Sequence, residues 1–567
     1  MLLRASCVLF AFACLLCVRT AYATPGPDSV AILANADVPE SVALAQSYAE
    51  ARQVPARQVC ALSMPTTEDI SLTDFQSMLL SPLLDCLRAA GVLDRIEAVV
   101  VIRGVPLRVR IPTPDGNMRA SVAAAIGAWQ SVMLTGEDFV GQPPGTAITC
   151  SGGSTCAIAR WANPYRTGPF EPDFTATRAG VEWHPVLVTM LHGRSYADAQ
   201  KLIDSALAAE AAGGVPGEIL LMRGRDSARG VLDTQYDAVA AALTTRGFSM
   251  VNIVDFASDS SGHDLAGFFT GTATLGATIE GNTFAPGSLV DNLTSVGAAP
   301  VNFRATGESQ VSIARWVAMG VAGVHGTTAE PLNNAFPSRF LYVDYADGAT
   351  LAEAYAKSMP FVYWQNLVLG DPMLAPFATR PEVTLSGVSS GDASTSASMV
   401  IVNATDALDR GDVSIELFLD GVAIARSDVG SLEHCLSIPD DGPHRLLAVA
   451  RAADDASGER PYRPKGWQEV RFTSSGAVGD CSAADAGVDA DGGAADSGMA
   501  DAGSDAGAPD ASVDLDASVD LDASLGMDAG TGSSGGGCGC TVTRGASSRG
   551  LVLVLLVMGL AGYRRRR

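Results

Sequence analysis

Short apolar runs alternate with amphipathic stretches along residues 29–378, and this alternation limits the fold more than any other feature of the chain. The run at 96–102 reads IEAVVVI, which is typical of a strand covered on both faces. The stretch at 195–212 instead spaces its apolar residues as a helix does. Strands that alternate with helices predict a three-layer α/β fold around a mostly parallel sheet.

The same periodicities locate the individual elements of this α/β domain, which we place at residues 24–378. Expected strands lie at 29–35, 59–64, 96–102, 185–191, 218–222, 250–256 and 321–325. Expected helices lie at 37–52, 73–90, 195–212, 234–246, 309–320 and 350–358. Residues 110–183 break the alternation and are rich in Gly, Pro and Thr, so we expect a long insertion over one edge of the sheet.

The pattern changes near residue 379. From 379 to 475, short alternating stretches are separated by Gly, Asp and Pro turns, and Asp420-Gly421 between two apolar runs is a hairpin signal. This segment predicts a small immunoglobulin-like β-sandwich. Residues 476–535 are mostly Asp, Ala, Gly and Ser, and their low hydrophobicity and one-signed charge predict a disordered linker.

The first 23 residues predict export. Arg4 precedes an apolar run at 7–18, and Ala21-Tyr22-Ala23 is a small-x-small cleavage site. We therefore expect a signal peptide at 1–23; a first transmembrane helix is the alternative. The whole chain has a formal net charge of −24, which argues against a nucleic-acid partner because such binding needs basic residues.

The cysteines fit an oxidising compartment. Three of the eleven lie in the expected signal peptide, and the others reach a compartment where disulfides persist. Cys150 and Cys156 are close enough in sequence to close a tight loop, and Cys60 with Cys86 would join a strand to a helix, although the sequence does not fix the connectivity. The spacing of Cys, His and acidic residues matches neither zinc nor EF-hand sites, so we expect no metal and no cofactor.

The last segment, 536–567, predicts sorting to the cell envelope. Cys538 and Cys540 lie in a Gly-rich motif, followed by an apolar stretch at 551–563 and four arginines that stay on the cytoplasmic side of a membrane. The order of these parts resembles the MYXO-CTERM sorting signal. The resemblance implies a sorting protease as a partner, cleavage and lipid attachment near Cys538 or Cys540, and display on the outer surface. An ordinary C-terminal membrane anchor is the alternative.

Most of the α/β domain resembles a family of exported bacterial proteins that has no established activity. The sequences that carry this resemblance include ANADVPESVALAQSYAEARQVP, SMPTTEDIS, VIRGVPLRV, PGSLVDNLTSVGA and LGDPMLAPF. A second resemblance, through GVAGVHGTT, GATLAEAYAKS and LGDP, is to gingipain-type cysteine peptidases of caspase-like α/β fold. It implies a His-Gly pair after an apolar strand and a nucleophilic cysteine after the next strand.

The chain departs from this peptidase pattern at the nucleophile. His192-Gly193 and His325-Gly326 both follow apolar runs, but no cysteine sits at a suitable strand end. Ser295 is the residue nearest to the expected nucleophile position. Either Ser295 replaces the cysteine, or the site is inactive, or the chemistry is different. Glu330, shortly after His325, is a further candidate because open α/β sheets place their sites at carboxyl ends of strands.

Each candidate also has a structural interpretation. His192 and His325 would then be hydrogen-bonded core residues, and Ser295 a turn or helix-cap residue. Arg103, at the end of a buried strand, would bind an anion or tie down a loop, and Asp291 would bind a ligand or cap a helix. His263 lies in a polar loop, where we expect no ligand role.

Two functions remain open from the sequence. The chain lacks a GxSxG elbow, a P-loop and a GxGxxG motif between strand and helix, which disfavours standard serine hydrolases and nucleotide binding. The first hypothesis is a membrane-anchored surface protein, built on a degenerate peptidase-like domain, that binds an unknown surface ligand. The alternative is a surface hydrolase that uses Ser295 with His192 or His325.

Overall fold

The computed structural model describes residues 24–475, apart from 113–117, 137–138, 140–160, 164–175, 179–180, 305, 395–396, 439 and 454–461. The expected signal peptide, acidic linker and sorting segment lie outside the described residues, as do Cys150, Cys156, Cys538 and Cys540. All of the described residues belong to one compact unit.

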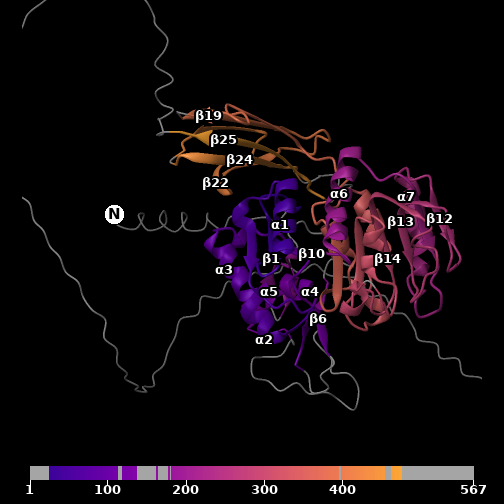
Figure 1. Ribbon diagram of the computed structural model, residues 1–567. Helices are drawn as coiled ribbons and strands as arrows, with labels where there is room; N and C mark the ends of the chain where they lie inside the picture. Colours follow the sequence, from indigo (N-terminus) through magenta and orange to yellow (C-terminus); the bar gives the residue numbers. More distant parts are fainter. Residues whose placement is uncertain are drawn as a thin grey trace, which may run out of the picture. The chain divides into compact units, whose positions relative to one another are not determined.

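A ten-stranded sheet forms the centre of the α/β part. Its strands are β1 (Val30–Asn35), β2 (Val59–Leu62), β4 (Ala98–Ile102), β10 (Leu187–Leu191), β11 (Glu218–Met222), β12 (Val251–Val254), β13 (Asp264–Thr270), β14 (Thr283–Asn292), β15 (Gly323–Thr327) and β17 (Asn366–Gly370). They lie in the order β12-β11-β13-β14-β15-β17-β10-β4-β1-β2. Figure 1 labels β12, β13, β14, β10 and β1 of this sheet. The strands from β12 to β15 are mutually parallel, and so are those from β10 to β2. Between the two sets, β17 pairs antiparallel with β15.

Three central strands, β13, β14 and β17, are absent from the sequence-based expectation. Both β13 and β14 contain glycines, which weaken a strand signal in the sequence. Gly267 in β13 is required by packing, because a Cβ there would lie 2.8 Å from the Tyr342 ring. The glycine that weakens the strand signal of β13 therefore makes room for the Tyr342 ring.

The helices agree more closely with the expectation. They include α1 (Pro39–Ala51), α3 (Ser81–Ala89), α4 (Val122–Gly127), α6 (Tyr196–Ala212), α7 (Tyr236–Thr245), α8 (Ile313–Ala318), α9 (Leu341–Ala346) and α10 (Leu351–Ser358). Helix α6 begins with a capping box between Ser195 and Asp198 and ends at Gly213, whose φ is +67°. The expected helix at 73–90 includes a π-helical stretch, Phe75–Leu80, before α3.

One described part of the expected insertion at 110–183, helix α4, packs on the ten-stranded sheet. Helix α4 contacts both β10 and β17, and most of its residues are buried. At the β2 edge of the sheet, Cys60 and Cys86 form a disulfide that joins β2 to α3. In the described part of the chain, no helix has both the length and the apolar character needed to cross a membrane.

Residues 382–474 form two smaller sheets. One has three strands, β18 (Glu382–Ser386), β20 (Ser398–Thr405) and β23 (Ser431–Leu436). The other contains β19 (Ala393–Ser394), β25 (Lys465–Ser474), β24 (Gly442–Arg451), β21 (Ser414–Leu419) and β22 (Val422–Ser427). All pairs except β19 with β25 are antiparallel, and apolar side chains from both sheets share one core. Asp420 and Gly421, both at positive φ, turn β21 into β22.

A buried ion cluster links the smaller sheets to the α/β part. The Lys465 ammonium on β25 lies 3.0 Å from carboxylate oxygens of Asp28 and of Glu97, and all three side chains are buried. Burial raises the pKa of Glu97. Burial also opposes ionisation of Asp28, but the nearby Lys465 charge outweighs it and lowers the pKa of Asp28. The Lys465 ammonium therefore lies between two carboxyl groups at a buried interface between the smaller sheets and the α/β part.

Candidate functional site

The carboxylate of Asp291 lies at the centre of the sheet, near the end of β14, and is fully buried. Its Oδ2 is 2.9 Å from His325 Nδ1, and its Oδ1 accepts a hydrogen bond from Arg339. Arg339 also donates to the Thr270 carbonyl of β13, at 2.9 Å. Burial disfavours the charge on Arg339, but the Asp291 carboxylate outweighs it and raises the pKa of Arg339. Asp291 is thus neutralised inside the protein rather than presented to solvent.

Both ring nitrogens of His325 are engaged in this cluster. Besides the contact with Asp291, Nε2 lies 3.1 Å from Asn366 Oδ1 on β17. The ring packs edge-on against Phe336, and the side chain has no exposed area. The structure therefore brings together two residues that the sequence named separately, His325 and Asp291, in a closed arrangement that leaves no ring nitrogen for Ser295.

His192, at the end of β10, is also buried. Its Nδ1 lies 3.3 Å from an Arg103 guanidinium nitrogen, and its ring packs edge-on against Phe303 with centroids 4.6 Å apart. Burial, together with the Arg103 charge, lowers the pKa of His192 to about 3. A neutral imidazole with so low a pKa is a weak general base near neutral pH.

Arg103 fits the loop-tying interpretation. Its guanidinium donates to the Gly193 carbonyl and lies over the Tyr196 ring, 5.3 Å from the ring centroid. These contacts join the segments that follow β4 and β10. The arginine thereby fixes the position of His192 from one side.

Ser295 lies in a turn directly after β14. Its backbone N–H donates to Gln310 Oε1 at 2.8 Å, and its carbonyl accepts from the Thr327 hydroxyl at 2.9 Å. Within the described part of the chain, no hydrogen bond joins the Ser295 hydroxyl to either histidine. Glu330 is exposed in the loop after β15, whereas the hydrogen-bond partners of the His325 ring are Asp291 and Asn366. The candidate catalytic residues are therefore not assembled into one site.

The strand that precedes and neighbours β14 gives a second reason why Ser295 does not fit the peptidase pattern. In the peptidase pattern, the His-Gly pair follows the strand before the nucleophile strand. Here that strand is β13, and it ends at Thr270, followed by Gly271. A threonine thus occupies the position at which the pattern requires a histidine.

A cleft of about 540 Å³ opens beside the loop that follows Ser295. Its walls come from three separate segments: Thr66, Thr67, Glu68, Asp69, Arg108, Ala299, Pro300, Val301 and Arg304. Arg108 pairs with Asp69 through two hydrogen bonds of 2.5 and 2.8 Å and also donates to the Thr328 carbonyl. Arg304 is exposed and its guanidinium has no hydrogen-bond partner among the described residues, while burial raises the pKa of Glu68. Sequence reasoning missed this cleft because no single motif contains its residues.

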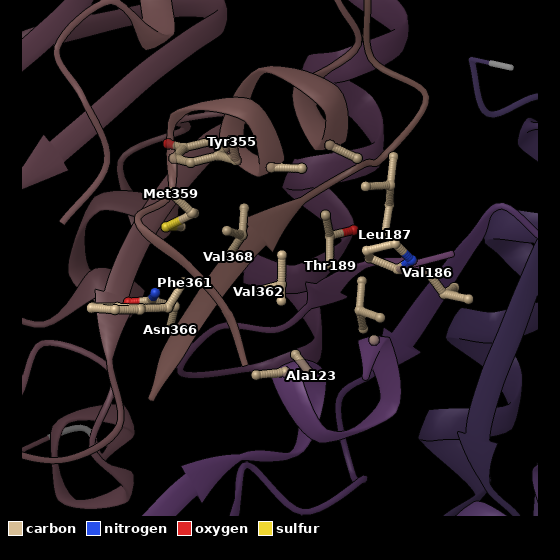
Figure 2. Close-up of a pocket in the computed structure, with 16 residues that line it drawn as sticks. Ala123, Val186, Leu187, Thr189, Tyr355, Met359, Phe361, Val362, Asn366 and Val368 are labelled. Carbon is tan, nitrogen blue, oxygen red and sulfur yellow. The ribbon is translucent and has the colours of Figure 1, made fainter. Parts of the chain in front are cut away.

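A second, apolar cavity of about 90 Å³ lies between α4, α10, β10 and β17 (Figure 2). Apolar side chains such as Val186, Val362 and Met359 form its wall, and no charged residue lines it. Thr189 and Asn366 line it too, and each carries a buried polar atom without a partner. Among the described residues, no group of three or more His, Cys, Asp or Glu side chains is placed to hold a metal ion.

Comparisons with known proteins identify no family. No family model and no curated protein matches the chain. Among solved structures, fibronectin(III)-like modules of Clostridium thermocellum CbhA are 14% identical, at a TM-score of 0.14, over 20% of this chain and 53% of the module chain. The Clostridium perfringens spore cortex lytic enzyme SleM is 12% identical, at a TM-score of 0.13, over 51% of this chain and 80% of its own. This chain thus spans about half the length of the CbhA chain. At these TM-scores, neither likeness supports an argument about function.

The low pKa of His192 predicts acid sensitivity. The unfolded chain binds a proton at His192 below its ordinary pKa of 6.5, whereas the folded protein does so only near pH 3. Between these values the unfolded state holds more protons, so falling pH costs up to about 1.4 kcal/mol of stability per pH unit. We expect urea unfolding between pH 7 and pH 4 to show this loss in the wild type and a shallower one in His192→Gln. Equal loss of stability between pH 7 and pH 4 in the wild type and in His192→Gln would contradict the low pKa of His192.

Proposed function

We propose that the chain is an exported, surface-anchored protein that binds a ligand through its α/β part and does not use Ser295 as a nucleophile. In this account the α/β part has a caspase-like fold that has lost the peptidase site. The two smaller sheets form an immunoglobulin-like spacer. The acidic linker at 476–535 and the cysteine-containing segment at 536–567 connect it to the outer surface.

The observation that carries this proposal is the engagement of both candidate histidines. A serine nucleophile requires an imidazole within hydrogen-bond reach to accept its proton. His325 is held on both ring nitrogens, and His192 is packed against Arg103 and Phe303. Neither ring contacts the Ser295 hydroxyl. The same residues therefore support a structural role more strongly than a catalytic one.

The cleft beside Arg304 supplies the chemistry for binding. An exposed guanidinium offers a planar set of donors that suits a carboxylate. Across the cleft, Glu68 and the hydroxyls of Thr66 and Thr67 can accept from an amine or an amide. A ligand that carries a carboxylate together with N–H donors, such as a short peptide, matches both sides. The cleft also lies next to the segments that follow strand carboxyl ends, where open α/β sheets bind ligands.

Peptide retention tests this function. Residues 24–488, which retain the whole described part, would be dialysed against an equimolar tripeptide pool and bound peptides identified by mass spectrometry. We expect retention by the wild type and a loss of about tenfold or more in Arg304→Glu, because a charge-assisted contact is replaced by repulsion. Arg426→Glu, on exposed β22, is the matched control and should retain the peptides. Equal retention by Arg304→Glu, or no retention by the wild type, would rule the proposal out.

Surface anchoring is tested separately in intact cells. If Cys538 or Cys540 receives the anchor, the double variant Cys538→Ser, Cys540→Ser should leave the cell surface, and the protein should appear in the medium. Thr541→Ser is the matched control and should stay at the surface. The measurement is immunoblotting of the medium and of cells with and without external protease. Wild-type behaviour of the double variant would exclude cysteine anchoring.

A further inference from the structure

A serine, a histidine and a glutamate are connected by hydrogen bonds at the amino ends of β11 and β13. Ser260 Oγ lies 3.2 Å from His263 Nε2 in the loop between β12 and β13. The other ring nitrogen, Nδ1, lies 2.8 Å from Glu218 Oε2, on the first residue of β11. In a Ser-His-acid triad, the histidine contacts the serine through one ring nitrogen and the acid through the other. Here the two distances fall within or at the edge of the normal hydrogen-bond range.

The surrounding residues hold this arrangement in place. Asn282, which is buried, accepts from the His263 backbone N–H at 2.8 Å and donates to the Ser260 carbonyl at 3.0 Å. One side chain thus fixes the backbone of both loop residues. Asn252 on β12 donates to the second carboxylate oxygen of Glu218 at 2.8 Å. Such supporting contacts keep the reacting side chains in a defined geometry.

The negative charge of Glu218 favours the His263 tautomer that can accept the Ser260 proton. The Glu218 carboxylate can only accept, so Nδ1 carries the proton of that contact and Nε2 is left to accept from the Ser260 hydroxyl. The Glu218 side chain is 15% exposed and that of His263 is 30% exposed, so the acid is shielded while the imidazole reaches solvent. The backbone N–H of Ser261, the residue after the serine, has no partner among the described residues. An N–H at this position is a typical oxyanion donor.

We propose that Ser260, His263 and Glu218 form a hydrolytic site for small O-acyl esters. Ser260 Oγ attacks the ester carbonyl carbon, and His263 Nε2 takes the hydroxyl proton. The tetrahedral intermediate collapses, the bond to the alcohol oxygen breaks, and His263 returns the proton to the departing alcohol. Water then repeats the cycle on the acyl-serine, releasing the carboxylic acid and restoring Ser260.

Two features select an ester. The alcohol of an ester leaves more readily than the amine of a peptide, and a single backbone N–H provides limited stabilisation of the oxyanion. The loop is also exposed rather than enclosed, which suits a small acyl group. This site lies at the amino ends of β11 and β13, whereas the Arg304 cleft is lined by segments that follow the carboxyl ends of β2 and β14. The two activities are therefore independent.

The test is labelling of residues 24–488 by a fluorophosphonate, with the labelled peptide identified by mass spectrometry, together with hydrolysis of p-nitrophenyl acetate. We expect the label on Ser260 and its loss in Ser260→Ala. His263→Gln should slow labelling about 100-fold or more. Glu218→Gln, which changes only the group that positions the histidine, should lower kcat with little change in KM. Ser258→Ala is the matched control and should label at the wild-type rate.

Folding of each variant is checked by its thermal midpoint and by circular dichroism. Absence of label in folded wild-type protein, or labelling of Ser260 that His263→Gln leaves unchanged, would overturn the proposal. Label on Ser295 instead would contradict the binding function proposed above, so the two ideas fail in distinguishable ways.

Discussion

The buried carboxylate of Asp291 is the constraint on which the centre of the molecule depends. A negative charge without solvent contact is costly unless cations and hydrogen-bond donors compensate it. Arg339 and His325 provide that compensation, and their further contacts reach Thr270 on β13 and Asn366 on β17. One carboxylate thereby connects four neighbouring strands, including the antiparallel junction between β15 and β17.

The Asp291 cluster limits which side chains at the carboxyl ends of the strands are available for chemistry or for binding. His325 is held by contacts with Asp291 and Asn366 on its two ring nitrogens. The turn at Ser295 is held through its backbone by Gln310 and Thr327. A rigid strand-end turn followed by an exposed Arg304 is suited to presenting side chains to a ligand. The proposed binding at this edge and the proposed hydrolysis at Ser260 rest on this difference: His325 and His192 are buried, whereas the His263 ring is partly exposed.

The sequence could predict the outer parts of the fold but not its centre. Runs such as β1, β4 and α6 are strongly periodic, and their predicted ranges differ from the observed bounds by a residue or two. The strands β13 and β14 are interrupted by glycine. At Gly267 the missing side chain leaves room for the Tyr342 ring, and no local sequence pattern reveals that contact. Sites assembled from distant segments were equally hidden.

The clusters around Asp291 and His263 show why the sequence does not reveal sites assembled from distant segments. Arg339 reaches Asp291 from 48 residues away, and Glu218 reaches His263 from 45 residues away. In the sequence, His263 has only a polar loop around it, and Ser-x-x-His spacing alone is too common to indicate a site. Only the parallel pairing of β11, β12 and β13 brings Glu218 beside that loop. The polar character that argued against a ligand role for His263 is, in the folded chain, what leaves its ring reachable from solvent.

The most direct test of this account is the free energy of unfolding of Arg339→Met, measured with urea on residues 24–488. Methionine keeps the apolar stem but leaves the buried Asp291 with one fewer cation. We expect a loss of about 3–5 kcal/mol relative to the wild type, while Arg426→Met on exposed β22 should change stability little. A loss below about 1 kcal/mol, the value typical of an exposed pair, would show that the Asp291 cluster does not hold the sheet together. His325 would then be available for another role.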